Sequence, residues 1–138
     1  MEKTYQGTQL QTLTENDFGP DKAWGLHAVI DLYECDLSLI SSEEQIRKFV
    51  IELCKEIGMK RHGETHIDRF GDGVTVSEGY SFMQFIETSS ITAHFDEPYK
   101  KAFIDIFSCK FFEAEKAVIF SQNFFKSKKA KVTVLVRD

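Results

Sequence analysis

Three consecutive strand-like segments in the second half of the chain constrain the fold most. Runs rich in apolar and β-branched residues cover residues 80–88, 90–95 and 102–109, and short turns separate them. Runs of this length, bounded by turn residues, are typical of strands. Strands joined by such short connections are expected to be antiparallel neighbours in one sheet.

The clearest helix is predicted after Ser42. Ser42 is a favourable N-cap, and Gln45 completes a capping box, in which two side chains satisfy otherwise unpaired backbone amides. Gly58 stands where a left-handed residue commonly ends a helix. Between these two ends, apolar residues recur at helical spacing and form one stripe: Ile46, Phe49, Val50, Leu53, Cys54 and Ile57. Cys54 is therefore expected to be a core residue. A second helix is predicted over residues 112–125.

The order of these elements predicts an α+β fold. A strand is expected over residues 26–33 before the first helix, another over 65–70, and a final one through Val132, Val134 and Val136. This order favours a two-layer sandwich, with helices on one face of a mostly antiparallel sheet. A sheet covered on one side leaves its other face for a partner, so a homodimer is expected.

The domain boundaries follow from the same patterns. Residues 1–22 are polar and contain Gly19 and Pro20, so they are expected to form an N-terminal arm. Residues 23–138 are expected to form the single domain that a chain of 138 residues can support.

Composition excludes several classes of protein. A net charge of −5 argues against nucleic acid as a partner, because general nucleic-acid binders need a basic surface. The lysine-rich run at 126–131 is interpreted as a solvated turn. The three cysteines form no CxxC pair, and His27, His62 and His66 show no ligand spacing, so no metal site is expected. Neither a signal peptide nor a membrane-length apolar run is present, so we expect a cytoplasmic protein without a membrane partner.

Four reactive residues fall on the central strands. Ser81 precedes Ser89 by eight residues, His94 follows Ser89 by five, and Cys109 follows His94 by fifteen. Taken singly, the serines are ordinary strand or turn residues, and the histidine and cysteine are ordinary half-buried or core residues. Together they place a hydroxyl, an imidazole and a thiol on strands that can face one another.

This set resembles the self-cleaving centre of the prokaryotic, pyruvoyl-dependent S-adenosylmethionine decarboxylase family. The resemblance covers residues 25–136 and includes further family-like positions at 25–27, 31–36, Tyr99, Ala102, Asp105 and Phe107. It implies the fold of that family and a self-processing decarboxylase of polyamine biosynthesis that acts on a small-molecule substrate.

The resemblance also implies a role for each reactive residue. Ser89 would become a pyruvoyl cofactor when the chain cleaves itself between Thr88 and Ser89. His94 would act as acid or base in processing, and Ser81 would assist by donating to the developing oxyanion. The pyruvoyl carbonyl would form a Schiff base with the substrate amine, and Cys109 would return a proton after decarboxylation.

The cleavage junction departs from the family pattern. Thr88 stands where the family usually has glutamate, and Ser90 stands where it usually has histidine. Ser90 is an alternative nucleophile, but a shift of one residue moves a side chain to the other face of the sheet. Ser89 is therefore preferred. The altered junction also motivates a further hypothesis, an unprocessed, non-catalytic relative that regulates an active subunit.

The segment after His94 bears on the substrate. The family typically continues Thr-Trp-Pro-Glu-Tyr, and this chain has Phe-Asp-Glu-Pro-Tyr at 95–99. Asp96 replaces the aromatic residue and Glu97 lies beside it, while Phe70 matches a second family aromatic. An acidic pair suits a substrate with a cationic tail, which narrowly favours L-arginine or L-ornithine. The alternative substrate is S-adenosylmethionine, the precursor of aminopropyl groups for spermidine. If Asp96 and Glu97 bind no substrate, they are solvated turn residues.

Overall fold

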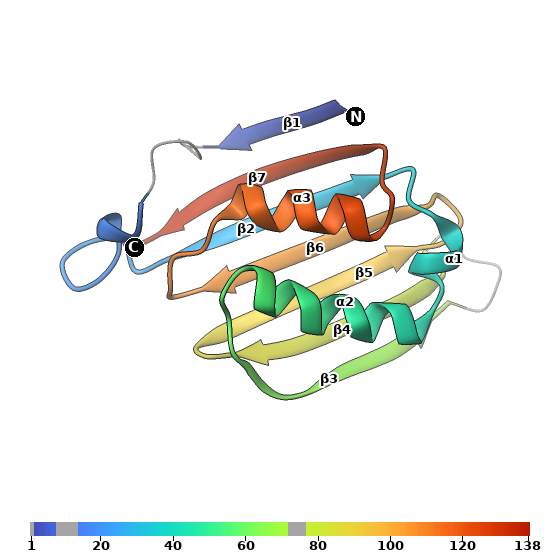
Figure 1. The fold of residues 1–138 in the computed structure, drawn as a ribbon, viewed down its shortest axis with the longest axis horizontal. Helices are drawn as coiled ribbons and strands as arrows, with labels where there is room; N and C mark the ends of the chain where they lie inside the picture. Colours follow the sequence, from blue (N-terminus) through green and yellow to red (C-terminus); the bar gives the residue numbers. More distant parts are fainter. Residues whose placement is uncertain (1, 8–13, 72–76) are drawn as a thin grey trace.

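A single seven-stranded sheet with helices on one face forms the structure, a computed structural model that describes residues 2–7, 14–71 and 77–138 (Figure 1). The strands are β1 (Glu2–Gly7), β2 (Gly25–Tyr33), β3 (Arg61–Phe70), β4 (Gly79–Ile86), β5 (Ser89–Asp96), β6 (Lys101–Ser108) and β7 (Lys129–Arg137). The helices are α1 (Leu37–Ile40), α2 (Glu43–Glu56) and α3 (Ala114–Phe124), preceded by a short 3-10 turn, Glu15–Asp17. The predicted α+β sandwich is confirmed.

The sheet has the order β1-β7-β2-β6-β5-β4-β3. All neighbours within the described residues are antiparallel except β1 and β7, which run parallel with Glu2 opposite Lys129. The sequence predicted a polar N-terminal arm over residues 1–22 and did not predict β1 within it. An edge strand is held by main-chain hydrogen bonds to a single neighbour, so it needs no apolar pattern that a sequence could reveal.

The core lies between the sheet and the two long helices. Along β5, Ile91, Ala93 and Phe95 are buried toward the helices, while the residues between them face the other side. Phe49 of α2 lies at the centre of a ring cluster, with its ring centroid 4.6 Å from that of Phe125. The other members of the cluster are Phe82, Phe95, Phe120 and Phe124. Aromatic packing of this kind fixes the helical layer on the sheet.

Helix α2 forms where the sequence predicted it. The Ser42 hydroxyl accepts a hydrogen bond from the Gln45 amide at 3.2 Å, and Gly58 has a φ of +70° just beyond the helix end. Cys54 is fully buried on the apolar stripe, as predicted, and burial raises the pKa of its thiol to about 11. The thiol is therefore protonated at neutral pH and serves as a small core side chain.

The face of the sheet away from the helices carries exposed apolar side chains. Met83 and Phe85 of β4, Leu135 of β7 and Trp24 before β2 are each about half exposed. Contiguous exposed apolar surface usually marks an interaction site. This open face is where the sequence predicted a second copy to pack. None of the helices within the described ranges is long and apolar enough to cross a membrane.

Candidate active site

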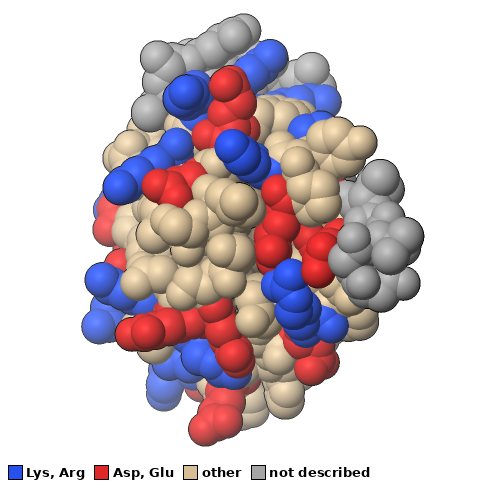
Figure 2. Space-filling view, turned by 90° about the vertical axis from the view of Figure 1, so that its right-hand side faces the viewer, with Lys and Arg blue, Asp and Glu red and all other residues tan. Residues whose placement is uncertain are grey.

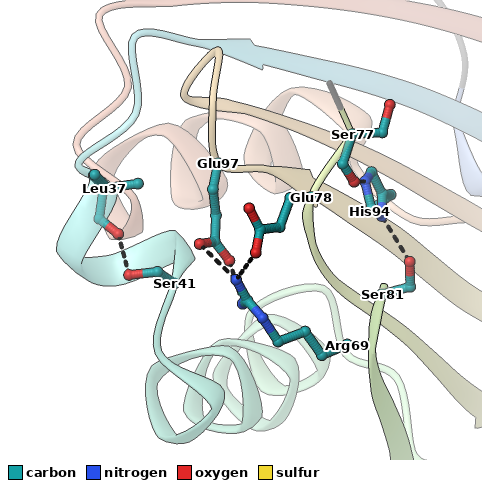
Figure 3. Close-up of polar contacts among 8 residues, drawn as sticks. All are labelled: Leu37, Ser41, Arg69, Ser77, Glu78, Ser81, His94 and Glu97. Carbon is teal, nitrogen blue, oxygen red and sulfur yellow. Dashed lines mark hydrogen bonds and ion pairs between the residues drawn. The ribbon is translucent and has the colours of Figure 1, made fainter. Parts of the chain in front are cut away.

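Ser81 and His94 form one hydrogen-bonded pair on the open face. The antiparallel register of β4 and β5 places them directly opposite each other, and Ser81 Oγ lies 2.7 Å from His94 Nδ1 (Figure 3). The other ring nitrogen, Nε2, lies 2.9 Å from the Ser77 carbonyl oxygen. A carbonyl can only accept, so Nε2 carries a proton, and in the neutral ring Nδ1 then accepts from the Ser81 hydroxyl. His94 is thereby held ready to act as a base through Nδ1.

Ser89 and Cys109 form a second pair. Ser89 begins β5 directly after a two-residue turn, opposite Ile86 of β4. Its hydroxyl donates to the carbonyl oxygen of Thr88 and accepts from the Cys109 amide at 3.2 Å. The Cys109 thiol is free and half-buried. The pair thus brings the Ser89 hydroxyl against its own preceding carbonyl, with the thiol-bearing residue beside it.

The two pairs lie at opposite ends of β5. Ser89 and His94 are five residues apart, and a strand rises by about 3.3 Å per residue, so roughly 16 Å separates them. The sequence assigned all four residues to one centre. Within a single chain, the structure brings them together two by two and does not bring His94 to Ser89.

A surface hollow of about 600 Å³ adjoins Ser89. Its walls are the turn segment 86–90 with His62, Phe85 and Phe107. Trp24 stacks on Phe107 with ring centroids 5.5 Å apart, and this contact extends the apolar side of the hollow. An apolar concavity with a few convergent polar groups is typical of a small-molecule site.

The residues assigned to substrate binding lie at the His94 end. Phe70, at the end of β3, is about half exposed, so its ring is accessible for stacking. The Asp96 carboxylate is almost buried and accepts from the Tyr99 amide at 3.4 Å, which closes the turn after β5. Glu97 binds Arg69 through both oxygens, at 2.6 and 3.1 Å. Both carboxylates assigned to a cationic substrate therefore already have partners within the chain.

The surface around this end shows no concentration of acidic charge. Figure 2 faces the end of the molecule toward which β5 points in Figure 1, and blue and red residues are interspersed among the coloured side chains. Mixed charge of this kind produces no strong field for steering a ligand of one sign. In the described ranges, no cluster of three or more His, Cys, Asp and Glu residues could hold a metal ion.

Arg69 and Ser77 belong to this site, and the sequence missed both. Ser77 contributes only its main-chain carbonyl, so its residue type carries no signal. Arg69 meets Glu97 across 28 positions of sequence, and only the pairing of β3, β4 and β5 brings them together. Its hydrogen bonds, first to Glu97 and then to Glu78, raise the pKa of the guanidinium, so Arg69 remains charged.

Gly79, at the start of β4, allows close approach to β5. A Cβ at this position would lie 1.8 Å from the Phe95 carbonyl oxygen, and its φ of +154° disfavours any other residue. Gly79→Ala is expected to destabilise the fold by about 3 kcal/mol or more and to displace Ser81. Gly63→Ala is the matched control, since its φ is +75° but no atom lies within 4 Å of the added Cβ. The control is expected to cost about 1–2 kcal/mol.

Urea denaturation monitored by circular dichroism measures both losses of stability. Equal shifts of the two midpoints would contradict the assignment of a backbone clash to Gly79.

Comparison with known proteins places the chain in a family. The sequence model of the S-adenosylmethionine decarboxylase family matches this chain over residues 26–138. The chain belongs to the S-adenosylmethionine decarboxylase family. It is 34% identical over 89 residues to the S-adenosylmethionine decarboxylase proenzyme of Aeropyrum pernix, a match that covers 64% of this chain and 63% of that relative.

A solved structure shows the same fold. The adenosylmethionine decarboxylase of Aquifex aeolicus VF5 superposes with a TM-score of 0.72 at 23% identity, over 84% of this chain and 92% of that one. At this level of identity the match confirms the fold of this chain. The chemistry of the site has to be inferred from the residues of this chain.

Proposed function

We propose that this protein is a self-processing, pyruvoyl-dependent decarboxylase that acts on S-adenosylmethionine. The observation that carries the proposal is the placement of the Ser89 hydroxyl against the Thr88 carbonyl. The Cys109 amide donates to the oxygen of the same Ser89 hydroxyl. Membership of the family and the similarity to a relative named a proenzyme support it.

The contacts of Ser89 suit cleavage of its own peptide bond. Ser89 Oγ attacks the Thr88 carbonyl carbon and gives up its proton, the C–N bond breaks as the Ser89 nitrogen takes up a proton, and the acyl group thereby moves from nitrogen to oxygen to form an ester. Loss of the Ser89 α-proton then expels the Thr88 carboxylate and leaves a dehydroalanine. One water enters and ammonia leaves, which produces a pyruvoyl group at the start of the C-terminal fragment. During attack the negative charge develops on the Thr88 carbonyl oxygen, whereas the Cys109 amide donates to Oγ and so holds the nucleophile beside the carbonyl carbon.

The residues around Ser89 fit the group that would form there. When present, a pyruvoyl group supplies a carbonyl that accepts electrons as carbon dioxide leaves the substrate. The hollow of about 600 Å³ beside Ser89 offers space for a substrate with an apolar side. Cys109 contacts Ser89 Oγ through its main-chain amide, and its free, half-buried thiol is the group we assign to donate the proton that replaces the carboxylate.

The separation of the two pairs supports a site that two copies of the chain share. His94 and Ser81 lie too far from Ser89 to reach it in one chain, and they face the open side of the sheet. When two sheets pack by their open faces about a two-fold axis, each copy offers its Ser81–His94 pair to the other. The exposed Met83 and Phe85 on this face provide apolar surface for that contact.

The substrate assignment follows from the contacts of the acidic pair. The sequence narrowly favoured L-arginine or L-ornithine because Asp96 and Glu97 could bind a cationic tail. Arg69 neutralises Glu97, and Asp96 closes a turn, so that reason no longer holds. Phe70 lies at the end of the sheet that carries His94, so in a site shared by two copies its exposed ring is available for stacking on a nucleobase. S-adenosylmethionine is therefore the preferred substrate.

Reductive trapping tests the proposal. Purified protein is incubated with borohydride and S-adenosylmethionine, L-arginine or L-ornithine in turn, and its denatured mass is measured. We expect two fragments that split between Thr88 and Ser89, and an adduct on the C-terminal fragment from S-adenosylmethionine alone. An adduct from arginine or ornithine would overturn the substrate assignment. A chain that stays uncut on long incubation would overturn the proposal that the protein is an enzyme and would favour the hypothesis of a regulatory relative.

A further inference from the structure

Arg69 bridges two segments that flank His94 (Figure 3). Its guanidinium binds both carboxylate oxygens of Glu97, just after β5, and also Glu78 Oε1 at 3.1 Å, just before β4. The side chains of Arg69, Glu78 and Glu97 are 38%, 27% and 16% exposed, so water screens the cluster only in part. Bidentate arginine–carboxylate pairs combine charge with a fixed geometry.

Through Glu78, this cluster holds the acceptor of His94. Glu78 directly follows Ser77, whose carbonyl oxygen accepts from His94 Nε2 at 2.9 Å. The Glu97 amide also donates to the Glu78 carbonyl at 2.9 Å, which ties the same two segments through their main chains. The Arg69 guanidinium lies 5.1 Å from the centre of the Tyr80 ring, a further contact with the start of β4.

We propose that Arg69 is a positioning residue for His94. By joining Glu78 to Glu97, it keeps the Ser77 carbonyl against Nε2 and so keeps the proton off Nδ1, the nitrogen that faces Ser81. The consequence for self-cleavage rests on the proposed function, whereas the effect on the imidazole ring does not.

Loss of Arg69 would change the electrostatics of this end of the sheet. Glu78 and Glu97 bind the same guanidinium nitrogen, so without the cation two carboxylates would face each other at close range. Like charges at such separation repel, most strongly where water screens them poorly. The segment that carries Ser77 is then expected to move away, and Nε2 loses its acceptor. Lysine would restore the charge but could not bind both carboxylates with the same forked geometry.

The ring nitrogens of His94 report the effect directly. In protein labelled with ¹⁵N-histidine, the wild type is expected to show one neutral tautomer, protonated at Nε2. Arg69→Met should move the two nitrogen resonances of His94 toward each other, as for a mixture of tautomers. Arg47→Met is the matched control, because Arg47 is similarly exposed and pairs with Glu43 at 2.9 Å. Arg47 also donates to the Thr65 carbonyl of β3 at 3.1 Å, so its loss tests the effect of one fewer arginine contact with β3 while Arg69, Glu78 and Glu97 stay paired. The control should leave both resonances unchanged.

A rescue variant separates positioning from general loss of structure. If Arg69 acts by neutralising its two partners, then adding Glu78→Gln to Arg69→Met should restore most of the wild-type ring signature, since one of the opposed charges is gone. The self-cleavage rate should fall by about 10- to 100-fold in Arg69→Met, recover partly in the double variant, and stay near wild type in Arg47→Met.

The outcomes distinguish this proposal from the function on which it partly rests. Unchanged His94 resonances in Arg69→Met would overturn the positioning role, whether or not the chain cleaves itself. A shift in Arg69→Met that Glu78→Gln fails to reverse would also overturn it. Shifted resonances that the second substitution restores would support the role, even in a chain that never cleaves.

Discussion

Replacing Ser89 with alanine is expected to leave the chain permanently intact and to reduce decarboxylation to background. Alanine has no hydroxyl to attack the Thr88 carbonyl, so neither the ester nor the pyruvoyl group can form. The denatured mass of the purified variant, followed over several days, should show only the uncut chain. A time course of carbon dioxide release from S-adenosylmethionine measures the loss of activity.

Ser90→Ala is the matched control for this experiment. Ser90 lies one position further along β5, opposite Phe107 of β6, whereas the contacts with the Thr88 carbonyl and the Cys109 amide are made by the hydroxyl of Ser89. The Ser90→Ala chain is expected to cleave itself between Thr88 and Ser89, as the wild type does. An uncut Ser90→Ala chain together with a cleaved Ser89→Ala chain would identify Ser90 as the nucleophile and contradict our assignment.

The Ser89 variant should fold normally, which makes its effect interpretable. The substitution removes a hydroxyl that accepts one hydrogen bond, from the Cys109 amide, in a half-buried setting. Such a loss costs about 1 kcal/mol, a small fraction of the stability of an ordinary domain. An unchanged circular dichroism spectrum and a melting temperature lowered by only a few degrees would confirm that chemistry alone is lost.

The parts of the fold that local sequence determines were predicted correctly. Ser42 and Gly58 act through backbone groups within a few residues, so the bounds of α2 follow from the sequence alone; of the predicted capping box, the described contacts include the bond from the Gln45 amide to Ser42 and not the reciprocal bond from the Gln45 side chain. The alternation of buried residues along β5 and β6 likewise reports which face the helices cover. Strand β1 could not be predicted in this way, because an edge strand depends on its neighbour's main chain.

Which site residues meet depends on the register between β4 and β5 and on the length of strand that separates the residues. Ser81 and His94 meet because β4 and β5 pair around a two-residue turn, which the sequence suggested but did not align. The five-residue gap between Ser89 and His94 spans most of a strand, so these residues cannot meet within one chain. The partnership of Arg69 with Glu97 joins strands that are not sequence neighbours. This ion pair leaves no local pattern in the sequence. The sequence therefore assigned Asp96 and Glu97 to a cationic substrate.

Co-expression of two inactive variants is expected to restore cleavage if two copies share each site. Ser89→Ala lacks the nucleophile, and His94→Ala lacks the base. A mixed dimer contains one site in which Ser89 of the His94→Ala chain meets the intact Ser81–His94 pair of the other chain. Each variant alone should remain uncut or be cut very slowly. When equal amounts assemble at random, about half of the His94→Ala chains lie in mixed dimers and should be cleaved.

The identity of the cleaved chain makes this experiment decisive. With tags of different mass, only the His94→Ala chain should split between Thr88 and Ser89, while the Ser89→Ala chain stays whole. The control pairs His94→Ala with a chain that carries both substitutions, so that no copy retains the imidazole, and no cleavage is expected. Cleavage in this control would show that His94 is dispensable. Absence of cleavage in the mixed sample, with dimers demonstrated, would mean that one chain must supply both pairs and that β5 must rearrange to bring them together.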